Sequence, residues 1–285
     1  SLALPAPSQQ RAFPQQVFFL NADVGWMLVA FNLAGTFSSY DLLQSTDGGT
    51  SWSRPHASFP SAMNAESQIK SISFRDRSTG WITGSSRSST AERSWLLQTH
   101  DGGRTWHEQR LPSPQGYSSS QSLLLGQPRF FTDREGLLPA STPLNPPPDG
   151  ITTFITHDGG ASWQSQPFFA LTTIAFNPEL SGGPLTPVFT DPSTGWSLFL
   201  TGEGKDTLNS LSLLHTADAG RSWQPFDQPL PVRPSDPGFQ FVTSRVLFAL
   251  ALTGEAVNVQ APSELYRTTD GGKTWFTLHY TISEG

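Results

Sequence analysis

The sequence contains no cysteine, which excludes disulfides, thiol nucleophiles and thiolate metal sites. Charged residues are also scarce: they account for 14% of the 285 residues, and the formal net charge is −6. Because nucleic-acid binding usually needs a basic face, we expect no nucleic-acid partner. No apolar run is long enough for a transmembrane helix, and no long apolar series follows the 3.6-residue period of a helix.

Turn-forming and aromatic residues are abundant instead. The chain has 25 Gly, 24 Pro, 20 Phe and 9 Trp. Glycine and proline favour turns and aromatic residues favour strands, so this mixture predicts an all-β protein with many loops. The length allows one large domain or two small ones.

One eight-residue motif occurs five times. Its consensus is Ser/Thr, any residue, Asp, Gly/Ala, Gly, any residue, Ser/Thr, Trp, and the tryptophans of successive copies are 52 to 60 residues apart. A repeat of this period predicts a repeat architecture. The copies are STDGGTSW at 45–52, THDGGRTW at 99–106, THDGGASW at 156–163, TADAGRSW at 216–223 and TTDGGKTW at 268–275.

A second motif precedes the first by a nearly constant distance. The segments NADVGW (21–26), DRSTGW (76–81) and DPSTGW (191–196) place Asn or Asp four residues before a Gly-Trp pair. DREGLL (133–138) is a degenerate copy, and the fifth unit is expected to have Ala249 in the place of the tryptophan. Each unit is therefore interpreted as four short strands, A to D, with one motif in the A–B turn and the other in the C–D turn.

Five such units predict a β-propeller of five four-stranded blades. We expect a Pro/Gln/Ser-rich N-terminal tether at 1–16 and a single propeller domain at 17–283. The blades are expected at about 17–58, 67–112, 123–169, 185–228 and 238–283.

The acidic and aromatic residues of the eight-residue motif are predicted to be structural. An aspartate at a turn accepts hydrogen bonds from the backbone N–H groups just ahead of it, and the glycine beyond it tolerates a positive φ. The tryptophan is expected to be buried between neighbouring sheets. These structural residues are Asp47, Trp52, Asp101, Trp106, Asp158, Trp163, Asp218, Trp223, Asp270 and Trp275.

The eight-residue motif resembles the Asp-box, also called the BNR repeat, of sialidases and sortilin-type receptors. Together with the Gly-Trp turns, it most resembles the photosystem II assembly and stability factor family and its bacterial relatives, over about residues 17 to 283. The resemblance implies a β-propeller, and it raises the sialidase reaction as one alternative. That reaction needs three arginines that bind the substrate carboxylate, a tyrosine nucleophile paired with a glutamate, and an aspartate that acts as the acid. This chain has four tyrosines, few glutamates and no matching arginine motif.

The loops opposite the two repeated turns are long and unlike one another, so a binding site is predicted there. These loops include 32–39, 85–93, 141–150, 201–210 and 253–263, with D–A links such as 53–68. The candidate contact residues on this face and at the channel mouth are Arg87, Arg93, Arg129, Lys205, Phe37, Tyr40 and Tyr117.

The leading hypothesis is a non-enzymatic scaffold outside the cytoplasm that presents this loop face to a protein or a glycan. The alternative is a carbohydrate-active hydrolase with its site at the channel mouth, which would need a pair of carboxylates. The expected inner strands carry almost no carboxylates. The six histidines have no metal-binding spacing and no phosphate loop occurs, so no metal and no cofactor are expected. Membrane contact is expected only through the N-terminal tether.

Overall fold

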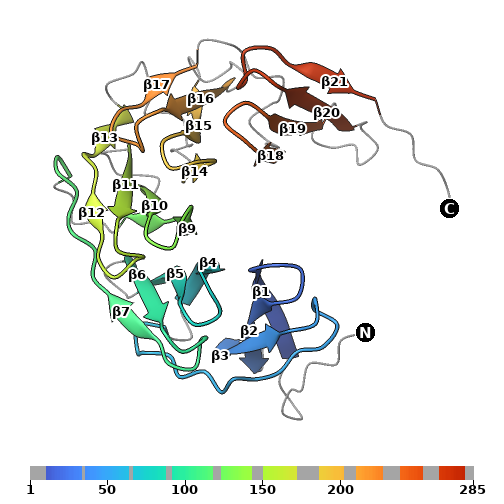
Figure 1. Cartoon of the computed structure of the whole chain (residues 1–285), viewed down its shortest axis with the longest axis vertical. Coiled ribbons are helices and arrows are strands. Elements are labelled where there is room, and N and C mark those ends of the chain that lie inside the picture. Colours follow the sequence, from blue (N-terminus) through green and yellow to red (C-terminus); the bar gives the residue numbers. More distant parts are fainter. Residues whose placement is uncertain are drawn as a thin grey trace. The chain divides into compact units, whose positions relative to one another are not determined.

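The computed structural model describes residues 11–33, 36–63, 67–87, 92–117, 123–142, 150–171, 186–201, 210–226, 238–252 and 263–279. In these residues the chain forms 21 strands, labelled in Figure 1, which are grouped into five antiparallel sheets in chain order. No helix in this part of the chain is long and apolar enough to cross a membrane. Five successive antiparallel sheets make the all-β, five-blade β-propeller fold that the repeats predict.

The first sheet has the order β1-β2-β3, formed by Arg11–Phe19, Gly25–Leu33 and Thr36–Ser45. Strand β1 begins six residues before the expected strand start at 17, within the segment interpreted as a tether. In place of a full fourth strand, Ser53 forms an isolated bridge with Gln44. The chain then turns away at His56, whose φ is 58°.

The second, fourth and fifth sheets are four-stranded, with the strands in sequence order. The second consists of β4 (Ser67–Phe74), β5 (Gly80–Arg87), β6 (Glu92–Thr99) and β7 (His107–Gln109). The fourth consists of β14 (Val188–Phe189), β15 (Gly195–Thr201), β16 (Ser210–Thr216) and β17 (Gln224–Pro225). The fifth consists of β18 (Gly238–Phe241), β19 (Leu247–Leu252), β20 (Ser263–Thr268) and β21 (Phe276–Leu278).

The third sheet is more fragmented than the others. Its main path is β12-β11-β10-β8, while β9 pairs with β10 and β13 pairs with β11. Its strands are β8 (Leu124–Leu125), β9 (Arg129–Phe130), β10 (Gly136–Ser141), β11 (Gly150–Thr156), β12 (Gln164–Ser165) and β13 (Phe169–Ala170).

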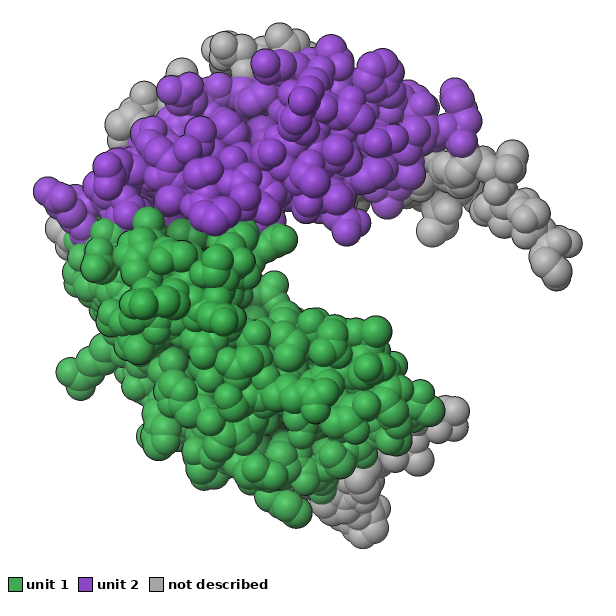
Figure 2. Space-filling view, in the orientation of Figure 1, with its two compact units in different colours: residues 1–113, 117–140, 154–165 green, residues 114–116, 141–153, 166–285 purple. Residues whose placement is uncertain are grey.

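The chain divides into two compact units, shown in different colours in Figure 2. The first unit contains residues 1–113, 117–140 and 154–165, and the second contains 114–116, 141–153 and 166–285. The first two sheets therefore belong to the first unit, the last two belong to the second, and the division runs through the third sheet.

A phenylalanine on the strand before the A–B turn of each sheet is a repeated feature that belongs to neither of the two predicted motifs. We call this strand, which in the third sheet is β9, the first strand of its sheet. The phenylalanine lies six residues before the start of the next main strand and pairs with the residue there, as Phe74 pairs with Gly80. A Cβ atom added to Gly80 would lie 2.5 Å from the Phe74 ring, so glycine is needed at this position. The five phenylalanines are Phe19, Phe74, Phe130, Phe189 and Phe241.

The tryptophan of each Gly-Trp turn is buried against the phenylalanine of the next sheet along the chain. Trp26 stacks on Phe74 with 3.6 Å between ring centroids, and Trp81 stacks on Phe130 at 4.5 Å. Trp196 and Phe241 repeat the arrangement at 6.2 Å. Burying roughly 150–250 Å² per ring contributes on the order of 4–6 kcal/mol as an upper bound, so these rings are the main packing element between neighbouring sheets.

The third and fifth sheets lack the Gly-Trp pair, and the structure shows which residues replace it. In the third sheet Leu137 follows Gly136 and is 3% exposed. In the fifth sheet Phe241 pairs with Leu247, which places Phe248 at the tryptophan position. The expectation that Ala249 takes this place is therefore wrong by one residue. Leu247 pairs with Thr268 as Gly195 pairs with Thr216, so the tryptophan position lies 27 residues before Trp275, as in the fourth sheet, and not 26.

Candidate functional site

The five Asp turns share one hydrogen-bond pattern, and Asp101 illustrates it. The Thr99 hydroxyl donates to Asp101 Oδ1 at 2.8 Å and accepts the N–H of Gly103 at 3.0 Å. The N–H of Thr105 donates to Oδ1 at 2.9 Å, and its hydroxyl donates to Oδ2 at 2.6 Å. The same bonds occur at Asp47, Asp158, Asp218 and Asp270.

These hydrogen bonds keep the Asp carboxylates ionised. Bonds from Ser51 and Ser45 lower the pKa of Asp47 to about 2, and bonds from Ser162 and Thr156 do the same for Asp158. Burial opposes ionisation of Asp101, but the bonds from Thr105 outweigh it and bring its pKa to about 2. A general acid must hold a proton near neutral pH, so these carboxylates are suited to fastening turns rather than to acid catalysis.

The A–B turns are capped by one side-chain oxygen in every sheet. In the second sheet Asp76 Oδ1 accepts the N–H groups of Ser78 and Thr79, both at 2.8 Å. Asn21 and Asp191 act in the same way in the first and fourth sheets. In the third and fifth sheets the cap is a hydroxyl, from Thr132 and Thr243 respectively.

Each Asp turn is also tied to the A–B turn of its own sheet. In the second sheet the N–H of Gly102 donates to the carbonyl of Ser78 at 2.8 Å. Ala219, which replaces glycine in the fourth sheet, keeps both the bond and a positive φ of 60°. The two sequence motifs thus form one fastening at one end of each sheet. The five bonds are Gly48 to Asp23, Gly102 to Ser78, Gly159 to Arg134, Ala219 to Ser193 and Gly271 to Arg245.

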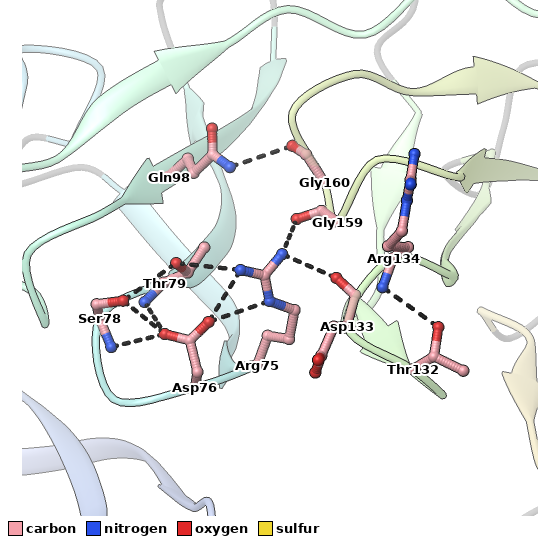
Figure 3. A network of polar contacts seen from close by, with 10 residues as sticks. All are labelled: Arg75, Asp76, Ser78, Thr79, Gln98, Thr132, Asp133, Arg134, Gly159 and Gly160. Carbon is pink, nitrogen blue, oxygen red and sulfur yellow. Dashed lines mark hydrogen bonds and ion pairs between the residues drawn. The ribbon is translucent and has the colours of Figure 1, made fainter.

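Arg75 extends this fastening from the second sheet to the third (Figure 3). Its Nη1 donates to the carbonyls of Asp133 at 3.1 Å and Gly159 at 2.7 Å. Its Nε and Nη2 donate to Asp76 Oδ2 at 3.1 and 2.9 Å. A guanidinium engaged on both sides in this way is a structural clamp rather than a ligand-binding group. No sequence pattern predicts this clamp, because the arginine is not part of either repeat.

The described members of the predicted contact set each interact with a neighbour of their own. Arg93 forms an ion pair with Glu108 of β7. The Tyr40 hydroxyl donates to the Ser67 carbonyl at 2.6 Å, and burial raises the pKa of Tyr40. Arg129 lies over the Phe131 ring at 5.7 Å.

The other predicted contacts are less completely defined by the structure. Tyr117 is half-buried at the end of a described stretch. Phe37 and Arg87 lie in β3 and β5, where the structure describes their backbone but not their side chains, and Lys205 is outside the described residues. Most of the long loops are also outside, so the loop face stays a prediction.

The first strands of the sheets show what the described part of the predicted channel-lining surface offers chemically. Within the described residues β1, β4, β9, β14 and β18 contain no Asp or Glu. Their exposed polar side chains include Lys70, Arg129 and Gln240. In the same residues no group of three metal-binding side chains comes together. These strands can donate hydrogen bonds, and in the part of them that the structure describes there is no pair of carboxylates of the kind that a glycosidase needs.

Comparison with known proteins shows the fold and no family. No protein-family model matches the chain, and no curated protein matches it. Among solved structures, the α-L-arabinanase of Penicillium chrysogenum complexed with arabinobiose has a TM-score of 0.51 and 13% identity, over 96% of this chain and 86% of that chain. A mutant α-L-arabinofuranosidase of Fusarium graminearum, in complex with an iminosugar inhibitor, has a TM-score of 0.50 and 13% identity, over 94% and 80%.

A further match is YCF48 bound to D1 peptide, with a TM-score of 0.45 and 16% identity over 97% of this chain and 88% of that chain. The hydrolases and YCF48 differ in what their names say they bind. The two hydrolase likenesses support the propeller fold, and at such low identities they do not show what this chain binds or whether it catalyses a reaction.

Proposed function

We propose that this chain is a non-enzymatic binding or assembly scaffold of the Asp-box type, similar in kind to the photosystem II assembly and stability factors. It presents the variable B–C and D–A loop face to a protein or glycan partner. The observation that carries the proposal is the contrast between the two ends of the sheets. At the turn end the repeated carboxylates and hydroxyls bond to their own backbone, as at Asp101. That leaves the unlike loops as the part of the chain free to determine specificity.

The chemistry of the described first strands supports binding over hydrolysis. A retaining or inverting glycosidase needs two carboxylates about 5 to 10 Å apart. The described first strands have none, and the carboxylates of the Asp turns stay ionised. An extracytoplasmic location is also part of the proposal. Fractionation of cells that produce the tagged full-length protein tests that location.

The binding proposal is tested by replacing loops on the predicted face. Variants in which 143–149 or 202–209, the loop residues between the flanking strands, become a Gly/Ser stretch of equal length are immobilised beside the parent and exposed to an envelope extract and a glycan array. We expect at least one loop variant to lose a partner that the parent retains. Arg77→Ala, an exposed change at the turn end, is the control and should bind like the parent. Equal loss from the control would contradict the assignment of the face.

The same protein is assayed for hydrolysis on a panel of aryl glycosides and arabino-oligosaccharides. We expect no turnover above buffer. Turnover that survives repurification and disappears on replacement of loop carboxylates such as Glu203 would overturn the scaffold proposal in favour of the hydrolase.

A further inference from the structure

The link between the first and second sheets runs along the Asp turn of the second sheet. The N–H of Ser58 donates to the Arg104 carbonyl at 2.8 Å, and the N–H of Trp106 donates to the Ser58 carbonyl at 3.2 Å. Ser58 thereby forms a parallel bridge with Thr105. We call this part of the link, residues 57–63, the strap of the second sheet.

The strap also contributes side chains to the core around the second sheet. Phe59 lies on the Trp106 ring, with 6.2 Å between ring centroids and 21° between the ring planes. Met63 is buried in the same cluster, and Ala57 and Ala62 pack against it. The strap is therefore held both by backbone hydrogen bonds and by apolar contact.

A similar contact braces the third sheet. The link that follows the second sheet reaches it at Gln115, whose carbonyl accepts the N–H of Phe168 at 2.9 Å. The Ser165 hydroxyl donates to the carbonyl of Ser113 in the same link, at 3.4 Å. The segment that precedes a sheet thus binds to that sheet in two successive cases.

The first Asp turn lacks such a brace among the described residues. In the eight-residue motif its Thr50 and Trp52 correspond to Arg104 and Trp106. Neither the Thr50 carbonyl nor the Trp52 N–H makes the backbone hydrogen bond of its counterpart with another described residue. Trp52 is half-buried, whereas Trp106 is 3% exposed. The first turn therefore presents the acceptor, the donor and the ring to which a strap binds in the second sheet.

The first strands of these two sheets correspond residue by residue. Phe19 pairs with Gly25 as Phe74, 55 residues further on, pairs with Gly80. The bulge that follows Pro14 in β1 recurs at the same offset, after Ile69 in β4. A constant offset through a bulge fixes which residues before the two strands correspond to each other.

The same offset aligns residues 2–5 with the beginning of the strap. Both segments contain, in order, an apolar residue, a small residue, an apolar residue and a proline. The corresponding residues are Leu2, Ala3, Leu4 and Pro5 in one segment and Ala57, Ser58, Phe59 and Pro60 in the other. The match ends at Ser8, the counterpart of the buried Met63. Residues 1–10 themselves lie outside the part of the chain that the structure describes.

We propose that residues 2–5 are the strap of the first sheet and dock on the first Asp turn, and that they are not a free tether. In this arrangement the N–H of Ala3 donates to the Thr50 carbonyl, and the N–H of Trp52 donates to the Ala3 carbonyl. Leu4 covers the half-buried Trp52 ring, as Phe59 covers its counterpart in the second sheet.

The length of the connection selects this segment of the chain as the occupant. Ala3 lies nine residues before Ala12 of β1, and Ser58 lies nine residues before Ser67 of β4. Ala12 and Ser67 hold the same position in the two sheets, because they pair with residues that are also 55 apart. A segment joined to its binding site in this way docks intramolecularly, so it outcompetes a free peptide of equal affinity.

The absence of cysteine allows an engineered disulfide to test the strap in the full chain. Ala3→Cys with Ser51→Cys joins the two positions of the proposed bridge. Neighbouring strands lie about 4.8 Å apart, which is within the Cα–Cα range of a disulfide. We expect most of the protein to form this bond within one chain in a mild redox buffer, as shown by a non-reducing gel and by mass spectrometry of the linked peptides.

Two matched variants make the result decisive. S58C/T105C places the same pair on the bridge of the second sheet and should close to a similar extent. A3C/T105C should stay reduced, because Ser58 already occupies that turn. If S58C/T105C closes while a folded A3C/S51C stays reduced, or closes only between two chains, the strap is overturned.

Hydrogen exchange in the cysteine-free chain gives an independent readout. Leu4→Asn should make the backbone N–H of Trp52 exchange roughly two- to tenfold faster, as expected for the loss of one hydrogen bond, and should leave that of Trp106 unchanged. Phe59→Asn should have the opposite pattern. An equal effect of Leu4→Asn on both tryptophans, or no effect on Trp52, would contradict docking on the first turn.

Discussion

The second and fifth sheets are built from the same repeat, yet they pack their aromatic residues differently. In the second sheet Phe74 covers Gly80 and lies edge-on to Trp106, with 6.1 Å between ring centroids. In the fifth sheet Leu247 occupies the glycine position, and it is fully buried. The ring edge-on to Trp275 at 6.3 Å is then Phe239, two residues before the repeated phenylalanine.

The hydrogen bonds of the Asp turn do not change between the same two sheets. Thr99 and Thr268 donate to Asp101 and Asp270 at 2.8 and 2.7 Å, and the matching glycine bonds are both 3.0 Å. A hydrogen-bonded turn depends on distance and angle, so few sequences satisfy it. Hydrophobic packing tolerates substitutions that keep volume and pattern. The fastening is therefore constant along this chain, whereas the ring packing varies from sheet to sheet.

Replacing Gly80 by alanine tests the packing of the Phe74 ring on the glycine, and it is expected to have the largest effect on stability. The new Cβ would meet Phe74 at 2.5 Å, so the free energy of unfolding should fall by about 1–3 kcal/mol in urea titrations. Gly195→Ala should behave alike, because its Cβ would lie 2.6 Å from Phe189. Adding Phe74→Leu should reduce the penalty of the glycine change. Strictly additive effects in that double-mutant cycle would contradict the clash.

The sequence predicts the hydrogen-bonded part of this molecule better than the packed part. The Asp turns and the caps at Asn21, Asp76 and Asp191 were visible because they need a given residue type at a given spacing. Thr132 and Thr243 were missed, because a hydroxyl can replace the carboxylate as cap. The signal for the phenylalanine six residues before the glycine was present in the sequence but small, since one aromatic residue per strand is common in β proteins.

Long-range features could not be predicted from spacing. Arg75 finds its acceptors at Asp133 and Gly159, 58 and 84 residues away along the chain. In the first sheet the chain forms one bridge at Ser53 in place of a full fourth strand and then turns at His56. No turn motif in the sequence predicts this turn. Of the candidate binding residues, Lys205 is outside the described residues, and the described Arg93 is paired with Glu108. Local patterns thus identify scaffold positions, whereas pairing over long separations depends on the whole fold.

Arg75→Ala tests the polar contacts between the second and third sheets. It leaves the carbonyls of Asp133 and Gly159 without this donor and should lower the free energy of unfolding by about 1–2 kcal/mol. Arg75→Lys should recover part of the loss, because an ammonium cannot reproduce the planar fork. Arg77→Ala, two residues away and exposed, should stay within about 0.5 kcal/mol. Equal losses at both arginines would show that net charge, and not the clamp, is responsible.

Asp101→Ala tests the hydrogen bonds of the Asp turn, which are constant from sheet to sheet. It is expected to have the smallest effect, a loss of about 1 kcal/mol in the free energy of unfolding by analogy with a helix cap. The stronger signature is pH dependence. Because folding lowers the pKa of Asp101 to about 2 from the ordinary 3.8, its contribution is complete above about pH 4 and is lost as the pH falls towards 2. The difference in unfolding midpoint between parent and variant should therefore shrink across that window. Arg104→Ala should leave the profile unchanged, since Arg104 reaches Asp101 through its backbone N–H. A difference between parent and Asp101→Ala that is independent of pH from 7 to 2 would mean that the ionised carboxylate does not hold the turn.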